Sequence, residues 1–316
     1  MAVQAPERPA TPAAERQRKE NRRKWRRSLN GGMTGWAFIA PATIIVVGLA
    51  FFPALWAFLL STKKTNLITP AKGVGAANYQ LMLEDPGLRD AVVHTLLFTA
   101  VFVPTSIIVG MLLAIALNQH IRLTGFYRTC IFVPFVASAA ATGILANFVF
   151  DPNFGLANNV LRVFHVPPQE FLESPTQAML VLVIIALWGS IGFNVVVYLA
   201  ALQDIPKDVV EAAVMDGANR SQVFRHVTLP ALGPVTVFTT IWQIITALQL
   251  FDLVYTTTKG QPLDSTVTIV YYIYRMAFEL LKYGYGSAIA YGLFFVTMLI
   301  TLVMVWYSRK SKVEAF

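Results

Sequence analysis

The sequence predicts an all-α integral membrane protein with six transmembrane helices and a polar helix–turn–helix between the fourth and the fifth. Three observations support this prediction. Hydrophobic residues make up 56% of the 316-residue chain and charged residues only 13%, whereas a soluble domain is usually about 45–50% apolar and 25% charged. The apolar residues are gathered in six long runs. Lys and Arg are concentrated in alternate connections between these runs.

Residues 1–34 form a basic tail in front of the first apolar run. The tail holds nine Lys or Arg residues and three Glu residues, and its first 15 residues are rich in Ala and Pro, a composition typical of disorder. Because Trp25 is its only aromatic residue and a span follows directly, we expect attraction to anionic lipid headgroups and no nucleic-acid partner. No convincing small-residue cleavage site follows the first apolar run, so we expect a retained helix rather than a signal peptide.

The six apolar runs contain no charged residue. In lipid, backbone polar groups must be satisfied within the segment, so these runs are predicted to be helices. About 20 residues cross a 30 Å hydrocarbon core; the fifth run is short and is expected to begin a few residues earlier. The predicted transmembrane domain, residues 35–307, contains the spans Gly35–Leu60, Thr95–Leu117, Cys130–Val149, Ala178–Leu202, Val235–Phe251 and Ser287–Tyr307.

The aromatic segment Ser265–Leu281 is predicted not to be a seventh span. It is short, it contains Arg275 and Glu279, and Lys282 lies just beyond it. Counting it as a span would also put the two termini on opposite sides of the membrane. We therefore predict an interfacial or re-entrant helix.

The distribution of Lys and Arg predicts the orientation of the chain. Seventeen of the 25 lie in the N-terminal tail, the connections after the second and fourth spans, and the C-terminal tail, residues 308–316. The positive-inside rule places these parts in the cytoplasm. We therefore predict a multi-pass protein of the cell (plasma or inner) membrane with both termini cytoplasmic.

The connection 203–234 is polar and contains Pro and Gly residues at positions that suit the starts and ends of helices. Pro206 suits the first position of a helix, where its missing N–H costs nothing. Gly217 can take the left-handed conformation that ends such a helix. A second short helix is predicted over 219–227, stopping at Pro230. The connection is therefore expected to form a helix–turn–helix at the cytoplasmic surface.

Several residues of this connection resemble the "EAA" coupling loop of ABC importer permeases. They lie at fixed spacing over some twenty positions: Glu211-Ala212-Ala213, Asp216-Gly217-Ala218, Phe224 and Leu229-Pro230. The similarity covers about residues 35–310 and points to the carbohydrate-uptake permeases related to the membrane subunits of the maltose importer. Phe251-Asp252 followed by Gly260-Gln261-Pro262 also resembles a family stretch, although the family has a second glycine where this chain has Gln261.

The resemblance implies a type I importer fold and a multi-subunit machine. Its other parts would be a second, homologous permease subunit in a heterodimer, a dimer of ATP-binding subunits and an extracytoplasmic solute-binding protein. The chain has no Gly-x-x-x-x-Gly-Lys-[Ser/Thr] string to hold phosphates. We therefore expect a non-catalytic subunit without a cofactor, with ATP and Mg²⁺ on the partner ATPase. Cys130 and the four His residues have no partners at metal-ligand spacing, so no metal site is predicted.

The resemblance also assigns the contact with the ATPase to the first helix of the connection and the turn after it. Short helices transmit motion because they move as rigid bodies. Small Ala residues permit close approach, whereas Phe224 and Leu229 are expected to pack internally. The predicted coupling residues are Glu211, Ala212, Ala213, Met215, Asp216, Gly217 and Ala218.

Polar and aromatic residues in the fourth and fifth spans are candidates for the solute path. Sugars are bound by amides and hydroxyls, with an aromatic ring under the C–H face. By distance from Glu211, these positions match the helix faces that line the maltose pocket in the related subunit. Hydrogen bonding between helices, about 0.6 kcal/mol per bond, is an equal alternative, and the partner permease is another possible holder of the solute. The candidates are Trp188, Ser190, Phe193, Asn194, Gln243, Thr246 and Leu250, the last three at helical spacing i, i+3 and i+7.

Together with these features, the resemblance implies the permease subunit of an ATP-driven, binding-protein-dependent importer of sugars or oligosaccharides that works by alternating access. The resemblance implies that the loaded binding protein docks on Asn78, Asp85, Phe154, Asn158 and neighbouring external loops. The alternatives are import of a glycerol-phosphate ester or another polar solute, and a stand-alone secondary carrier. The spans contain no Asp, Glu, Lys or Arg in their interiors, which argues against an ion-coupled carrier. Import rather than export follows from the resemblance alone.

Overall fold

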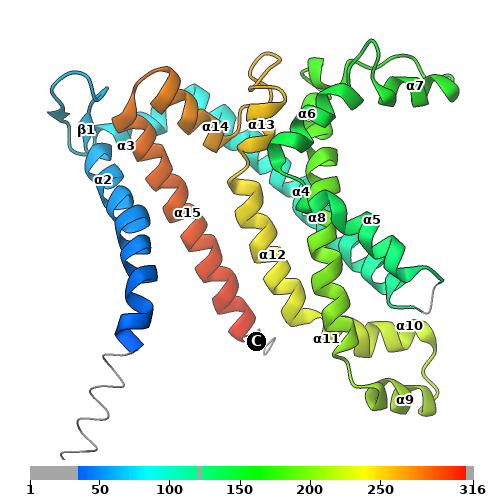
Figure 1. Ribbon diagram of the computed structural model, residues 1–316. Coiled ribbons are helices and arrows are strands. Elements are labelled where there is room, and N and C mark those ends of the chain that lie inside the picture. Colours follow the sequence, from blue (N-terminus) through cyan, green and yellow to red (C-terminus); the bar gives the residue numbers. More distant parts are fainter. Residues whose placement is uncertain (1–34, 120–121, 311–316) are drawn as a thin grey trace, which may run out of the picture. The chain divides into compact units, whose positions relative to one another are not determined.

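The structure is a computed structural model that describes residues 35–119 and 122–310 (Figure 1). The predicted basic tail and residues 311–316 lie outside the described residues. The chain divides into two compact units, the first ending at Leu59. Within the described residues, four helices are long and apolar enough to cross a membrane, and the number of spans rises to six if each of two bent helix pairs counts as one span. The six predicted spans correspond to these four helices and two bent pairs.

The first unit contains most of the first predicted span, a helix over Gly35–Ser61. It includes a π-helical turn, η1 (Val47–Phe51), and continues as α2 (Phe52–Ser61). Pro53 has no N–H for an i→i−4 bond, and π turns are one way in which a helix accommodates such a loss. Large apolar side chains stay exposed along it, including Phe38 at 83%, so this surface suits lipid.

The core of the second unit is built on four helices. They are α4 (Pro86–Leu117), α8 (Ala178–Gln203), α12 (Gly233–Leu248) and α15 (Tyr283–Lys310). Tyr198 of α8 and Phe98 and Phe102 of α4 are among the largest fully buried side chains. The helix α4 begins nine residues before the predicted span, because Asp85 caps it and Pro86 suits its first position.

The third predicted span is a bent pair rather than one straight helix. It consists of α5 (Thr124–Val136) and α6 (Ala139–Val149), which meet at 102°. Ala137 and Ser138 between them are extended, and the Ser138 hydroxyl accepts a hydrogen bond from the backbone N–H of Ala141. An N-cap in the middle of an apolar run therefore starts a new helix there. Apolarity alone does not reveal this break.

The polar connection forms the predicted helix–turn–helix, with two differences. The helix α9 (Lys207–Met215) begins one residue after Pro206, which stands at the N-cap. The second arm runs through α10 (Arg220–Val223), a π turn η3 (Phe224–Thr228) and α11 (Leu229–Ala231). It does not stop at Pro230, because that residue lies in the first turn of α11, where an N–H is not required. The arm then meets α12 at 60°.

Short elements lie at the opposite end of the second unit from α9 and α10 (Figure 1). The segment around Arg275 is helical only over α14 (Ile269–Tyr274) and η4 (Arg275–Glu279), too short to span, as predicted. The remaining elements at this end are β1 (Lys63–Lys64) and β2 (Lys72–Gly73), which pair antiparallel, α3 (Ala77–Glu84), α7 (Leu156–Val163), η2 (Phe171–Glu173) and α13 (Asp252–Thr256).

Candidate solute cavity and coupling segment

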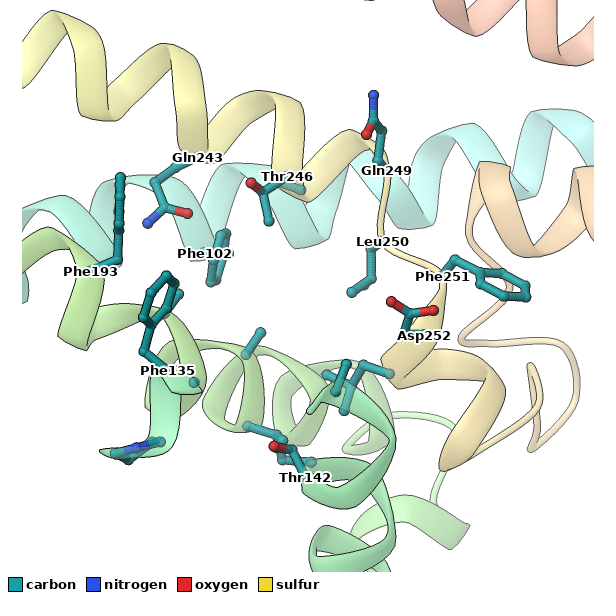
Figure 2. Close-up of a pocket in the computed structure, with 18 of the residues that line it drawn as sticks. Phe102, Phe135, Thr142, Phe193, Gln243, Thr246, Gln249, Leu250, Phe251 and Asp252 are labelled. Carbon is teal, nitrogen blue, oxygen red and sulfur yellow. The ribbon is translucent and has the colours of Figure 1, made fainter. Parts of the chain in front are cut away.

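A cavity of about 280 Å³ lies between α4, the α5–α6 pair, α8, α12 and the start of α13 (Figure 2). Aromatic rings form much of its wall. The ring of Phe193 contacts Phe135 at 5.6 Å and Trp242 at 5.5 Å between centroids. Phe98 and Phe102 of α4 stack at 5.1 Å and also line the cavity. Such a wall offers ring faces to the C–H groups of a solute.

Polar groups are set among these rings. Gln243 and Thr246 come from α12 and Ser190 from α8. Asp252, at the start of α13, points toward the cavity (Figure 2) and is the one charged side chain among the described residues that line it. The cavity therefore combines apolar ring surface with amide and hydroxyl groups.

Five of the seven predicted path residues lie on this wall: Ser190, Phe193, Gln243, Thr246 and Leu250. Trp188 is 46% exposed and does not line the cavity. Asn194 is fully buried behind the wall. Leu250 lies beyond the end of α12 at Leu248, so the predicted helical i+7 relation does not hold for it, although it reaches the wall from the unwound segment.

The buried amides of Asn194 and Gln243 are joined. The Gln243 Nε2 donates to Asn194 Oδ1 at 2.9 Å, and Asn194 Nδ2 donates to the carbonyl oxygen of Ser106 at 3.0 Å. The Oε1 of Gln243 is buried and has no hydrogen-bond partner among the described residues. Asn194 thus bonds between helices, whereas Gln243 both bonds between helices and lines the cavity.

The sequence prediction missed Phe98, Phe102 and Phe135 on the wall. In the sequence they are ordinary apolar residues of two spans, and helical spacing alone does not separate a cavity wall from a core. The i, i+4 spacing of Phe98 and Phe102 shows that they share a face of α4. It does not show that α8 and α12 leave a space opposite that face.

The seven predicted coupling residues all lie on the α9 hairpin, which consists of α9, the turn after it and α10, residues 207–223. Gly217 has φ +86°, as predicted for the residue that turns the chain, and Asn219 and Gln222 form a capping box that starts α10. Met215 is 86% exposed. Leu229, predicted to pack internally, is instead 41% exposed, because α11 is a surface turn at the bend before α12.

Two hollows adjoin this hairpin. The larger, about 1030 Å³, separates α9 and α10 from the ends of α4 and α8, and Glu211 and Ala218 line it. The smaller, about 330 Å³, is lined by Ala213, Asp216 and Gly217 together with residues of α10 and η3. The seven residues therefore do not share one face: Glu211 lines the hollow beside the ends of α4 and α8, Asp216 and Gly217 line the one beside the second arm, and Ala218 lines both.

Three of the four residues predicted to dock a binding protein instead hold the protein's own structure. The Nδ2 of Asn78 donates to the carbonyl oxygens of Ser61 and Lys63. Asn158 is 3% exposed and bonds to backbone groups of Pro152 and Gln169.

Asp85 also holds an internal cluster. Its Oδ2 accepts hydrogen bonds from Tyr272 at 2.7 Å and Tyr285 at 2.6 Å, while its Oδ1 caps α4. Burial alone would raise the pKa of Asp85, but the bonds from Tyr285, Tyr272 and two backbone N–H groups together lower it. Of the four predicted docking residues, Phe154 is exposed, at 63%.

The comparisons with known proteins agree with this architecture. Residues 106–312 match the family "Binding-protein-dependent transport system inner membrane component". The lactose transport system permease protein LacF of Rhizobium radiobacter is 34% identical over 286 residues, 89% of this chain and 95% of that protein. The sn-glycerol-3-phosphate transport system permease protein UgpA of Agrobacterium fabrum is 32% identical over 255 residues, 80% and 87% of the two chains.

A solved structure has the same fold. A chain in the crystal structure of a bacterial ABC transporter that imports the acidic polysaccharide alginate has a TM-score of 0.80 at 22% identity, over 91% of this chain and 99% of that one. The fold and cavity define a multi-pass membrane permease of the type I importer fold. The chain belongs to the family of binding-protein-dependent transport system inner membrane components and is an ABC transporter permease subunit.

Proposed function

We propose that this permease imports a neutral, hydroxylated solute, a sugar or an oligosaccharide, through the cavity between α4, α8 and α12. The observation that carries the proposal is the cavity wall, which combines aromatic rings with Ser190, Gln243 and Thr246. Ring faces stack on the C–H surface of a sugar, while amides and hydroxyls bond its OH groups. The lactose permease among the relatives supports the same solute class.

Import by this permease would require partner subunits. ATP and Mg²⁺ would bind a dimer of separate ATPase subunits, which would dock on the α9 hairpin at Glu211, Ala212, Ala213, Met215, Asp216, Gly217 and Ala218. A second permease would complete the pathway, and a solute-binding protein would deliver the solute at the end of the molecule that carries α7, α13 and α14. Both termini would be cytoplasmic, on the same side as the basic connections.

The coupling part of the proposal is tested with glycine variants. Gly217→Arg places a side chain at φ +86°, a backbone conformation that costs a non-glycine residue roughly 1–2 kcal/mol, and adds bulk to the exposed turn. Gly217→Asn tolerates that conformation. Gly125→Arg is the matched control, since Gly125 lies in α5 with nothing within 4 Å of an added Cβ.

Each variant is produced with its partner subunits, and the bound ATPase and solute-stimulated ATP hydrolysis are measured in membrane vesicles. We expect Gly217→Arg to lose both while still inserting, and Gly217→Asn and Gly125→Arg to keep them. An ATPase that remains bound and coupled in Gly217→Arg would exclude this hairpin as the docking element.

A glycerol-phosphate ester is the second candidate, because UgpA is among the relatives. Asp252 favours the neutral solute, since a carboxylate repels a phosphate and the described lining carries no Lys, Arg or His. Uptake of radiolabelled lactose in competition with sn-glycerol 3-phosphate separates the two. Competition by the phosphate ester but not by unlabelled neutral saccharides would contradict the sugar proposal.

A further inference from the structure

Two linked hydrogen bonds, called the relay below, connect α4 through α8 to the cavity wall on α12. The relay runs from the backbone carbonyl of Ser106 on α4, through Asn194 on α8, to Gln243 on α12, with donor–acceptor distances of 3.0 and 2.9 Å. Asn194 is 0% exposed and Gln243 1% exposed. The relay therefore begins at a backbone group and ends at a side chain that lines the cavity.

The carbonyl at the start of the relay fixes the direction of every bond in it. A backbone carbonyl only accepts hydrogen bonds, so Asn194 must turn its NH₂ group toward Ser106 and its oxygen toward Gln243. Gln243 must then turn its NH₂ group toward Asn194. Reversing either amide would place two donors or two acceptors face to face. The atom of Gln243 left outside the relay is therefore its oxygen.

Close helix packing keeps Asn194 in place. A Cβ atom added at Gly110 would lie 2.5 Å from the Cβ of Asn194, far inside van der Waals contact. The absence of a side chain at Gly110 thus lets α4 and α8 approach closely at the level of Asn194. At that distance the Asn194 amide reaches the carbonyl of Ser106, one turn away on α4.

The free oxygen at the other end needs a donor. Gln243 Oε1 and Ser265 Oγ are the buried side-chain polar atoms without a partner in residues 35–119 and 122–310. Leaving a buried acceptor unpaired destabilises a protein, and Gln243 stands on the wall beside Phe193 and Thr246 (Figure 2). A hydroxyl group that enters the cavity can supply the missing donor.

We infer that Asn194 is a positioning residue that makes Gln243 present a hydrogen-bond acceptor to the solute, so that the solute must offer a hydroxyl group there. The inference rests on the proposed function, because it assigns the polarity of one contact with a hydroxylated solute. It moves Asn194 from the solute path to a place behind it. Solute selectivity then depends on a residue that does not line the cavity.

The test uses selectivity rather than transport alone. Vesicles that contain the complete transporter are given lactose and a set of monodeoxylactoses, each lacking one hydroxyl group, and KM is measured for each. The unchanged protein should bind one of these analogues about tenfold more weakly than lactose, or about 1.4 kcal/mol. Gln243→Leu should abolish this discrimination. Asn194→Leu should reduce it to twofold or less, since the freed amide can turn either end to the solute.

Tyr198→Phe is the matched control. Tyr198 is also a fully buried α8 residue that bonds to α12, through Thr239 at 3.1 Å, but it does not line the cavity. This variant should keep the tenfold discrimination. Asn194→Ala provides a smaller replacement in case Asn194→Leu does not insert. Full discrimination in both Asn194 variants, or equal loss in Tyr198→Phe, would overturn the positioning role.

An error in the proposed solute class can be distinguished from an error in the role of Asn194. If the unchanged transporter takes up neither lactose nor maltose, trehalose or raffinose, the solute class is wrong. The positioning role is then decided on the amide itself, in ¹⁵N-glutamine-labelled protein in nanodiscs. The side-chain NH₂ signal of Gln243, assigned by its absence in Gln243→Leu, should shift in Asn194→Ala and stay in Tyr198→Phe. An unchanged signal in Asn194→Ala would refute the inference.

Discussion

Replacing Gly110 by alanine tests the contact between α4 and α8 directly. The new Cβ would lie 2.5 Å from the Cβ of Asn194, whereas carbon atoms prefer about 3.5–4.0 Å, so the helices must part by about 1 Å. Overpacking of this kind costs about 1–3 kcal/mol. Losing the bond from Asn194 to Ser106 adds about 0.6 kcal/mol for an interhelical bond in a membrane. Alanine returns up to about 1 kcal/mol through its helix propensity.

The expected net destabilisation is about 1–3 kcal/mol, which for a chain of 316 residues corresponds to a fall in Tm of about 2–5 °C. Gly189→Ala is the control: it lies on α8, and an added Cβ meets nothing within 4 Å, so only the gain in helix propensity applies. Thermal unfolding of both variants is followed in detergent by size-exclusion fluorescence. If Gly110→Ala unfolds at or above the temperature of Gly189→Ala, the close contact described here is wrong.

Further predictions concern the end of the second unit that carries α3, α7 and α14, and the contact between α6 and α13. Asp85→Ala should lower stability by about 2–4 kcal/mol, since it removes a helix cap and two hydrogen bonds to a charged group; Asp85→Asn should cost less because it keeps the cap. The folded pKa of Asp85 is lowered, so its contribution to stability should be full well above the ordinary value of 3.8 and should shrink as the pH falls from that value through the lower folded pKa; a Tm difference between the parent and Asp85→Asn that does not shrink as the pH is lowered below 3.8 would contradict this. Asn158→Ala leaves three backbone groups without their partner and should speed proteolysis of residues 150–170, the segment that contains α7; unchanged cleavage would disprove this. Gly143→Val should reduce the folded yield because an added Cβ meets Thr256; the same change at Gly125 should not.

The sequence predicted those features that depend on local chemistry. Within the described residues, the charge-free runs located the four membrane-length helices and the two bent pairs, because lipid imposes internal hydrogen bonding on any segment that crosses it. The left-handed Gly217 followed from its place after a helix. The break at Ser138 was not predictable from hydropathy, since the run is apolar and free of charge on both sides of it. A single serine cap decided it.

Of the elements that line the cavity, the sequence pointed to α8 and α12 but not to α4, the α5–α6 pair or α13. Gln243 and Thr246 stood out because polar groups are rare within spans. The same reasoning misplaced Asn194, since an amide within a span gives one signal whether it bonds to another helix or to a solute. Asn78 in α3 and Asn158 in α7 were misassigned for a related reason: a polar residue of a short surface helix can satisfy backbone groups of its own chain as well as meet a partner. Only tertiary contacts distinguish these cases.

The chain bends by 60° between α11 and α12, so a tilt of α12 about this bend would move the far end of the helix most. Gln243 lies ten residues along the helix from Gly233, or about 15 Å from the pivot at 1.5 Å per residue. A tilt of about 10° at the pivot would displace Gln243 sideways by about 2.6 Å. That displacement is nearly the length of its 2.9 Å hydrogen bond to Asn194. The bond would therefore be present in one tilt position of α12 and broken in the other. The end of the Gln243 amide that faces the solute, acceptor or donor, would then depend on the tilt of α12.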